Sequence, residues 1–356
     1  MLYVARSRLR GGPTWLALLV VAAASLSACS SGSHSPSAGP STSSSQPSSS
    51  QPSSTASKSS PSTPTATDAP VVAKTGITVA GAFNAKPTLT FPASGPPKQL
   101  VEQTLVPGNG ALVASGDTVI ANDIGEIWPT KAGSQAKVFD SSFSRGAPDG
   151  FVVGAGAVIP GFDKTLVGKR LGTRILLSIP PADGYGSSGN SQAGISGSDT
   201  LVFVVDLLAD YKPNASAPGV AASQLPATGW PKITNTPGQQ PQVTSVAGVK
   251  APSSPTSELL VKGSGAKIDP NKTLVLQLVQ TDIATGKQTQ STWGKQPQLV
   301  SAQTVLGVAS ALSGQSIGSR AVTLLPATPA QPATATSAAQ PATPAEMLII
   351  DVVGQY

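Results

Sequence analysis

The chain has few of the side chains on which metal and redox chemistry depend, because its 356 residues include one cysteine and one histidine. The single cysteine, Cys29, excludes an internal disulfide. The single histidine, His34, lies in a serine- and proline-rich stretch, where we expect it to be solvated and without a metal or base role. No metal or phosphate motif stands out elsewhere, so we predict neither a metal nor a cofactor.

Charged residues (11%) and aromatic residues (4%) are also scarce. The formal net charge is +6, and Arg6, Arg8 and Arg10 supply three of the positive charges. Because no run of lysine and arginine alternates with aromatic residues, we predict that the protein does not bind nucleic acid. The 36 glycines and 33 prolines would suggest disorder if spread evenly, but proline and serine concentrate in particular segments and leave the rest able to fold.

The N-terminal hydrophobic run, residues 15–24, is shorter than the about 20 residues that a membrane-spanning helix needs. It follows several arginines and precedes Leu26-Ser27-Ala28-Cys29, so residues 1–28 are predicted to be a secretion signal. The quartet resembles the bacterial lipobox, which implies cleavage before Cys29 and lipid attachment to it. This places an exported protein at the outer face of the cytoplasmic membrane or in the cell envelope, with the membrane as a partner through the lipid anchor. The alternative is an ordinary signal peptide with an incidental cysteine.

Composition divides the remaining chain into four parts. Residues 29–70 are almost entirely Ser, Pro, Thr, Ala and Gly, and we predict a disordered tether because they cannot bury enough apolar surface to offset chain entropy. Residues 71–211 and 229–356 carry β-rich runs and are predicted to be two domains. A proline-rich stretch at 212–228 is predicted to be the linker between them.

The short β-rich runs of the first domain, broken by Gly, Pro, Asn and Asp, predict an antiparallel sheet. Phe162, Leu166 and Val167 recur at helical spacing and predict one short helix over 161–168 that packs its apolar side onto this sheet. The strands are expected at 88–91, 98–105, 117–127, 137–139, 174–179 and 201–208.

The most informative block spans residues 151–203. It combines an apolar turn at 158–162 with a loop at Tyr185 and an all-apolar strand at 201–205. Because apolar side chains on an exposed turn are costly in water, we predict that Val158, Ile159 and Phe162 form the floor and wall of a pocket closed by Tyr185. No histidine or paired carboxylates accompany this block in the sequence, which disfavours an enzyme that works by acid–base chemistry.

Residues 137–208 resemble the FKBP-type peptidyl-prolyl cis/trans isomerases. The resemblance implies an α+β fold, in which an antiparallel half-barrel wraps around a short helix, and an activity on the proline-containing peptide segments of exported proteins. It extends less clearly back to about residue 108, and the segment before that, from about residue 83, is expected to be an addition to the family fold. The residues that carry it are Val138-Phe139-Asp140-Ser141-Ser142, Gly154, Val158-Ile159-Pro160-Gly161-Phe162, Gly168, Gly172, Tyr185-Gly186 and Thr200-Leu201-Val202-Phe203.

The resemblance also implies roles for individual residues. Phe162 matches the aromatic residue at the pocket floor, the Ile159 backbone N–H matches the donor to a bound carbonyl, and Tyr185 matches the hydroxyl that points to the substrate. Read without the resemblance, the phenylalanines could be core residues, Tyr185 a loop anchor and Asp140 the cap of a turn. The implied catalytic residues are Tyr185, Asp140, Phe139, Ile159 and Phe162, and the implied substrate-binding residues are Val158, Ile195, Phe203 and Phe151.

The chemistry of proline isomerisation suits such a block. The barrier of about 18–20 kcal/mol arises from amide resonance, so lowering it requires no nucleophile and no metal. A dry pocket that binds the twisted amide better than either planar isomer accelerates the reaction about tenfold for each 1.36 kcal/mol of preference.

Two positions depart from the family pattern. Alignment through Gly125 puts Asp123 where the family commonly has a wall tyrosine, and alignment through Gly154 puts Asp149 where it commonly has a pocket phenylalanine. These changes predict weaker binding of macrolide ligands. They leave open a reduced activity, or a non-catalytic surface lipoprotein that binds peptides or proteins with FKBP-like folds.

The C-terminal region repeats features of the first domain, which predicts an internal duplication. Residues 158–174 align without gaps with 304–320, and Gly108-Asn109-Gly110 is answered by Gly263-Ser264-Gly265. The second copy is degenerate, because Val308 stands for Phe162, Leu348 for Phe203 and a Pro/Ala/Thr loop for Tyr185. We therefore predict two half-barrels, of which the second is a structural or protein-binding module, with Trp293 either in its core or exposed to a partner.

Overall fold

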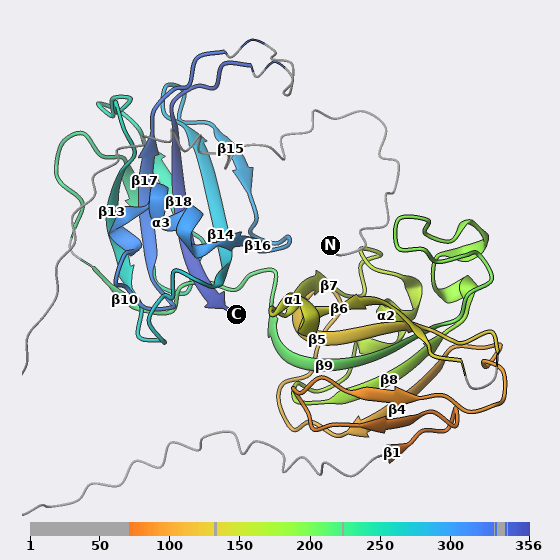
Figure 1. Cartoon of the computed structure of the whole chain (residues 1–356). Coiled ribbons are helices and arrows are strands. Elements are labelled where there is room, and N and C mark those ends of the chain that lie inside the picture. The colour runs from red at the N-terminus through yellow and green to blue at the C-terminus, as the bar shows by residue number, and fades with distance from the viewer. Residues whose placement is uncertain (1–70, 132–133, 223, 331, 333–338, 340) are drawn as a thin grey trace, which may run out of the picture. The chain divides into compact units, whose positions relative to one another are not determined.

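The computed structural model describes residues 71–131, 134–222, 224–330, 332, 339 and 341–356 (Figure 1). The predicted secretion signal, Cys29 and the predicted tether lie outside the described residues. Within these ranges, no helix is both long and apolar enough to cross a membrane. The strands form two large antiparallel sheets, one within residues 101–211 and one within residues 220–355, and two small sheets.

The first large sheet has the strand order β4-β8-β9-β5-β6, and β7 also pairs with β5. Strands close to the expected positions are present, whereas β7 and helix α1 lie where the sequence patterns gave no signal. The elements are β4 (Val101–Val106), β5 (Thr118–Ile127), β6 (Lys137–Ser141), α1 (Ser142–Arg145), β7 (Asp149–Val152), α2 (Pro160–Leu166), β8 (Arg174–Ile179), the 3-10 helices η1 (Pro181–Asp183) and η2 (Gly186–Ser188), and β9 (Leu201–Tyr211).

Strand β9 is buried on both faces, which explains its unbroken run of apolar side chains. Alternate residues of a strand point to opposite faces of the sheet. Leu201, Phe203 and Val205 belong to the cluster that includes α2, whereas Val202 and Val204 belong to the cluster on the other face. Both faces of the sheet are therefore covered.

Helix α2 covers the first of these faces. Its Phe162 and Leu166 are buried against the sheet. Pro160 begins the helix, where a missing N–H needs no partner and the fixed φ suits helical backbone. A Cβ added at Gly161 would lie 2.8 Å from Cδ1 of Ile179, so the glycine allows α2 to approach β8 closely.

A small sheet of β1 (Val71–Val72), β2 (Thr78–Ala80) and β3 (Thr88–Thr90) covers the opposite face (Figure 1). Ile77 and Val79 pack there against Leu176 of β8 and Val202 of β9. The segment ahead of β4 thus completes a second hydrophobic layer of the first domain.

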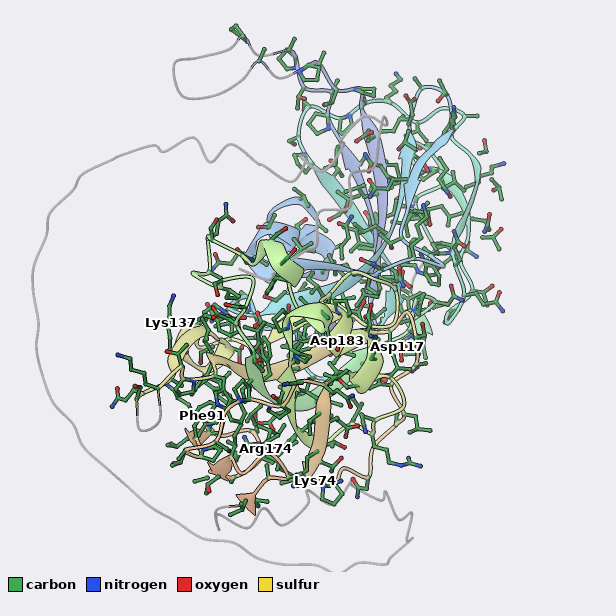
Figure 2. All side chains as sticks on the ribbon, turned by 90° about the vertical axis from the view of Figure 1, so that its right-hand side faces the viewer. Lys74, Phe91, Asp117, Lys137, Arg174 and Asp183 are labelled. Atoms are coloured by element: carbon green, nitrogen blue, oxygen red, sulfur yellow. The ribbon has the colours of Figure 1, made fainter. Side chains whose placement is uncertain are left out.

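A buried ion pair fastens this small sheet to the large one. Arg174 on β8 donates through Nε and Nη2 to the two carboxylate oxygens of Asp206 on β9, each at 2.7 Å, and both side chains are 1% exposed. Arg174 also donates to the carbonyls of Gly81 and Ala85 in the β2–β3 turn, and Asp206 accepts from the backbone N–H of Asn84. Figure 2 labels Arg174 near these first strands.

The second large sheet has the order β10-β13-β17-β18-β14-β15, and β16 also pairs with β14. A two-stranded sheet of β11 and β12 accompanies it. The elements are β10 (Val220–Ala221), β11 (Lys232–Thr234), β12 (Gln242–Ser245), β13 (Thr256–Lys262), β14 (Thr273–Asp282), β15 (Gln288–Ser291), β16 (Gln298–Ser301), α3 (Ala302–Val308), η3 (Ser310–Leu312), β17 (Arg320–Leu325) and β18 (Glu346–Gln355).

The two sheets have equivalent strand orders. The run β13-β17-β18-β14-β15 of the second sheet corresponds to β4-β8-β9-β5-β6 of the first, and β16 pairs with β14 as β7 pairs with β5. Arg320 faces Asp351 across β17 and β18 as Arg174 faces Asp206 across β8 and β9. Arg320 is completely buried, donates to Asp351, and also binds Oδ1 of Asn235 after β11. In both sheets a buried arginine therefore ties a preceding segment to the back of the sheet.

The tight glycine turns also correspond. A Cβ at Gly108 would lie 2.3 Å from the carbonyl oxygen of Leu171, and a Cβ at Gly263 would lie 2.3 Å from that of Ile317. No other residue type fits at either position without a shift of the backbone.

The gapless alignment of 158–174 with 304–320 is nevertheless wrong at the helix. It would begin the second helix at residue 306, opposite Pro160, whereas α3 begins at Ala302 directly after β16. The loop that separates β7 from α2 has no counterpart there. The alignment holds in the turn before the next strand, where Gly172 and Gly318 both have positive φ, 86° and 91°.

The segment 212–228, predicted to be a linker, contains residues that join the second sheet. Ala217 is fully buried and donates its backbone N–H to Asp351 at 2.9 Å, and β10 pairs with β13. Trp293 packs partly buried against the hydrophobic cluster on the β11–β12 side of the sheet, which favours its reading as a core residue.

Candidate active site

A pocket in the first domain encloses about 370 Å³ of empty space, part of it open to solvent. Seven of its nine lining residues are those that the sequence predicts as site residues, and the other two are Asp123 and Asp149. The lining consists of Asp123, Asp140, Asp149, Phe151, Val158, Ile159, Phe162, Tyr185 and Phe203.

Aromatic rings form the floor of this pocket. Phe162 of α2 meets Phe203 of β9 edge to face, with ring centroids 4.8 Å apart, and Phe151 of β7 at 5.5 Å. Phe139 of β6 does not line the pocket but packs behind it, edge to face against Phe203 at 5.3 Å. Gly125 of β5 lies beneath both rings, since an added Cβ would come within 2.8 Å of each. The predicted aromatic set is thus present, with Phe139 as a support.

The turn before α2 supplies the apolar wall. Asp163, in the first turn of the helix, accepts hydrogen bonds from the backbone N–H groups of Gly154 and Gly156 at 2.6 and 2.7 Å. These bonds hold the turn against the helix N-terminus. Val158 and Ile159 are consequently buried, at 8% and 7% exposure, and line the pocket rather than facing solvent.

The loop that carries Tyr185 lies between η1 and η2, and Tyr185 packs against the same cluster as α2. Lys164 of α2 binds Asp183 of η1 at 2.5 Å and so links the helix to this loop. Ile195 is buried in the cluster but does not line the pocket; its backbone forms a bridge with Asn190 that supports the loop from behind.

Three carboxyl groups form the remaining wall, one each from β5, β6 and β7. One oxygen each from Asp123, Asp140 and Asp149 lies within 4.8 Å of the other two. Arg145, at the end of α1, pairs with both Asp140 and Asp149. Carboxylate oxygens are suitable ligands for hard cations, but here a guanidinium already binds two of the three groups.

Arg145 is the site residue that sequence reasoning missed. Ser141 caps α1 by accepting from the backbone N–H of Ser144 at 3.2 Å, and Gly146 ends the helix in the left-handed region. This single turn directs Arg145 back toward Asp140, which therefore pairs with a guanidinium rather than capping the turn. No sequence pattern indicated Arg145, because α1 ends at this residue and its partner Asp149 lies on strand β7.

Asp123 is the most unusual group in the pocket. It is 3% exposed, and its Oδ1 has no hydrogen-bond donor among the residues that the structure describes. Burial, together with the charges of Asp140 and Asp149, raises the pKa of Asp123 well above its usual range. In its protonated form Asp123 can donate to Asp149, whose own pKa is raised by burial although Arg145 opposes the rise.

The arrangement can bind and distort a ligand. The structure corrects one expectation, because it brings three carboxyl groups to the apolar block, where the sequence indicated no paired carboxylates. The nine lining residues include no serine, cysteine, histidine or lysine. An apolar floor beneath a few polar groups is suited to an enzyme or binding protein that encloses a small ring and fixes the orientation of the bonds attached to it.

Comparison with known proteins identifies this class. Residues 110–208 match the model of the FKBP-type peptidyl-prolyl cis-trans isomerase family. An FK506-binding protein of Streptomyces anulatus is 36% identical over 124 residues, which cover 35% of this chain and 96% of that protein. A probable FK506-binding protein of Corynebacterium glutamicum is 32% identical over 123 residues, which cover 35% and 97%. Peptidyl-prolyl cis-trans isomerase FKBP15-1 of Arabidopsis thaliana is 49% identical over 81 residues, 22% of this chain and about half (52%) of that protein.

The chain belongs to the FKBP-type peptidyl-prolyl cis-trans isomerases. The resemblance that the sequence motifs of residues 137–208 indicate is therefore confirmed. The matched residues, 110–208, include every residue that lines the pocket, whereas the C-terminal sheet lies outside the match.

Proposed function

We propose that the protein is an exported isomerase, anchored by a lipid on Cys29, that assists the folding of exported proteins at Xaa-Pro bonds through the pocket under Tyr185. One observation carries the assignment of the site. The aromatic residues that would hold a proline ring, Phe162 and Phe203, line the same pocket as Tyr185 and Asp140, the polar side chains that would face the imide.

In this proposal, the proline ring enters over Phe162 and is gripped by apolar contacts on its faces. The Ile159 backbone N–H and Tyr185 then orient the imide on one side of the ring. A twisted imide has lost its resonance and its carbonyl has less negative charge, so a pocket that excludes water and fixes this geometry favours it over the planar isomers. Nothing is transferred to or from the peptide, which fits a site without a nucleophile.

Export and anchoring are supported by the sequence alone. The hydrophobic run at 15–24 and the quartet that ends at Cys29 support a cleaved signal and a lipid on the cysteine, and the proline- and serine-rich residues 30–70 would hold the domains away from the membrane. The substrates would then be proline-containing segments of exported chains near the membrane.

We propose that the second sheet is a degenerate FKBP-like domain without an isomerase site. Its matching strand order and its buried Arg320–Asp351 pair support the common origin. The pairing registers support the loss of the site, because the acidic wall has no carboxylate there. At the positions of the second sheet that are equivalent to Asp123, Asp140 and Asp149, the pairing registers place Leu278, Gln290 and Gln298. A protein-binding role for this domain is consistent with the loss.

The alternative is a surface lipoprotein that binds peptides without isomerising them. Asp123 and Asp149 favour it, because they stand where the family pattern has a tyrosine and a phenylalanine. This alternative predicts peptide binding with an exchange rate that stays at the uncatalysed level.

The two are separated by measuring cis–trans exchange of a proline peptide by NMR with residues 30–356. We expect acceleration by the wild type and a loss of about tenfold or more when Phe162→Ala is combined with Tyr185→Phe, because ring contact and hydroxyl are removed together. Val308→Ala serves as the control and should leave the rate unchanged. It also truncates a buried helix residue, but in helix α3 of the C-terminal region. Binding without acceleration would support the alternative, and an unchanged rate in the double variant would refute this site.

A further inference from the structure

The acidic wall of the pocket has more carboxyl groups than positive charges. If all were ionised, Asp123, Asp140 and Asp149 would carry three negative charges against the single positive charge of Arg145. The guanidinium pairs with Asp140 and Asp149, while Asp123 is 3% exposed and its Oδ1 lacks a donor among the described residues. A buried carboxyl oxygen without a hydrogen-bond donor is costly unless a ligand or a proton compensates it.

The unpartnered oxygen belongs to a residue that lines the substrate pocket. A ligand that fills the pocket therefore comes into contact with Asp123. A cationic hydrogen-bond donor is the group that compensates the charge, and nearby rings such as Phe151 and Phe203 also favour a cation.

Building on the proposed isomerase function, we infer that this pocket selects proline segments in which lysine or arginine adjoins the proline, with Asp123 as the acceptor of the basic side chain. The specificity of the site then differs from that of an uncharged pocket, in which an apolar neighbour of proline is preferred.

A monovalent organic cation fits the charges better than a divalent metal ion. Mg²⁺ and Ca²⁺ require about six or more oxygen ligands, and two of the three carboxylates here are shared with Arg145. A metal would also be placed close to that guanidinium. An ammonium or guanidinium needs only the unpartnered Oδ1 of Asp123 and can approach it on a flexible apolar stem that suits the pocket walls.

Binding of the basic side chain is coupled to a proton. The groups that face Asp123 are Asp140 of β6, Asp149 of β7 and Arg145 of α1, and burial and the two carboxylates favour a proton on Asp123 in the empty pocket. When an ammonium ion arrives, the Asp123 carboxyl loses this proton to the solvent and the ammonium–carboxylate pair forms. A neutral peptide leaves the proton in place.

The inference is tested by comparing kcat/KM for four peptides that carry lysine or Nε-acetyl-lysine directly before or directly after the proline, together with a leucine peptide as the reference. With residues 30–356, we expect the lysine peptide to exceed its acetylated form by about tenfold in at least one position, as a charge-assisted hydrogen bond would give. Asp123→Asn should abolish this ratio, and the leucine peptide then reports any change of rate that is common to all peptides. Asp269→Asn, which removes the same charge in the turn before β14, should leave the ratio unchanged.

Calorimetry in two buffers of different ionisation enthalpy gives a second readout. Proton release is expected when the lysine peptide binds the wild type, and none is expected with Asp123→Asn or with the acetylated peptide. A merely structural role of Asp123 would lower the rates for all peptides alike and leave the ratio in place, which would overturn the inference. Equal kcat/KM for lysine and acetyl-lysine peptides at both positions would also overturn it.

Two further results distinguish the remaining possibilities. If the wild type does not isomerise even the leucine peptide, the proposed function fails rather than the specificity alone. If Mg²⁺, Ca²⁺ or Mn²⁺ alone binds to the wild type and not to Asp123→Asn, the pocket is a metal site and the inference is wrong.

Discussion

At the scale of single residues, Asp123 gives the clearest prediction for stability. Its pKa is raised in the folded protein above that of the unfolded chain, so its contribution to stability is fully present below the unfolded pKa of about 3.9 and is lost as the pH rises through the folded pKa. Asp123→Asn has no carboxyl group to ionise. The free energy of unfolding of this variant, relative to wild type, should therefore increase from acid to neutral pH.

Urea unfolding at a series of pH values measures this difference, and Asp269→Asn controls for the change in net charge. A stability difference between Asp123→Asn and wild type that is independent of pH would contradict the assigned electrostatics.

Residue types alone predicted four of the pocket residues, and the resemblance to the family supplied Asp140, Phe151 and Phe203. Phe162, Val158 and Tyr185 could be predicted because apolar side chains on turns and loops are costly in water unless they line a pocket. The acidic wall could not be assembled in the same way, because it depends on the registers of β6 and β7 on β5 and on the single turn of α1 that returns Arg145. Those are tertiary facts, which residues separated by 4 to 26 positions do not reveal.

At the scale of the elements, Gly161 and Gly307 test the packing of the two helices. The gapless alignment makes them equivalent, but a Cβ at Gly161 would lie 2.8–3.1 Å from three atoms of Ile179, whereas a Cβ at Gly307 meets nothing within 4 Å. Gly161→Ala should destabilise the first domain by about 1–3 kcal/mol through overpacking. Gly307→Ala should be neutral or stabilise by about 0.5–1 kcal/mol, because alanine favours helical backbone.

Thermal or urea unfolding of both variants checks this contrast. Equal effects of the two substitutions would mean that α2 and α3 pack alike and that the structural difference between them is wrong.

The buried arginine of the first sheet makes a further prediction. Arg174→Met would leave Asp206 buried without its guanidinium and would free the turn at Gly81 and Ala85. Breaking such a pair costs about 3–5 kcal/mol, and residues 71–92 should then exchange their amide hydrogens faster. Hydrogen exchange by mass spectrometry measures this.

Arg320→Met is the matched control, since it should loosen the segment around β11 and β12 and leave residues 71–92 protected. Faster exchange of residues 71–92 in that variant, or none in Arg174→Met, would contradict the role given to the buried pairs.

The strands were easier to predict than the helices for a physical reason. β8 and β9 are buried on both faces, so their apolar runs are continuous and unmistakable. The offset of α3 against α2 arises because β16 runs directly into its helix, and short helices leave too few apolar positions to fix their start.

At the scale of the whole molecule, the proposed lipid anchor makes Cys29 the residue that decides where the protein resides. Cys29→Ser removes the only thiol in the chain. In a bacterial host that processes lipoproteins, we expect wild type to incorporate labelled fatty acid and to sediment with membranes, and the variant to do neither. Label or membrane association that persists in Cys29→Ser would leave the anchor without support.

The central claim is that a proline ring lies on Phe162 and Phe203 while its imide is isomerised. Intermolecular NOEs between a bound proline peptide and the protein test this most directly. The account predicts NOEs from the proline ring protons to the rings of Phe162 and Phe203. Exchange that is catalysed while the proline ring shows NOEs only to the second sheet, for example to Leu348, would contradict it.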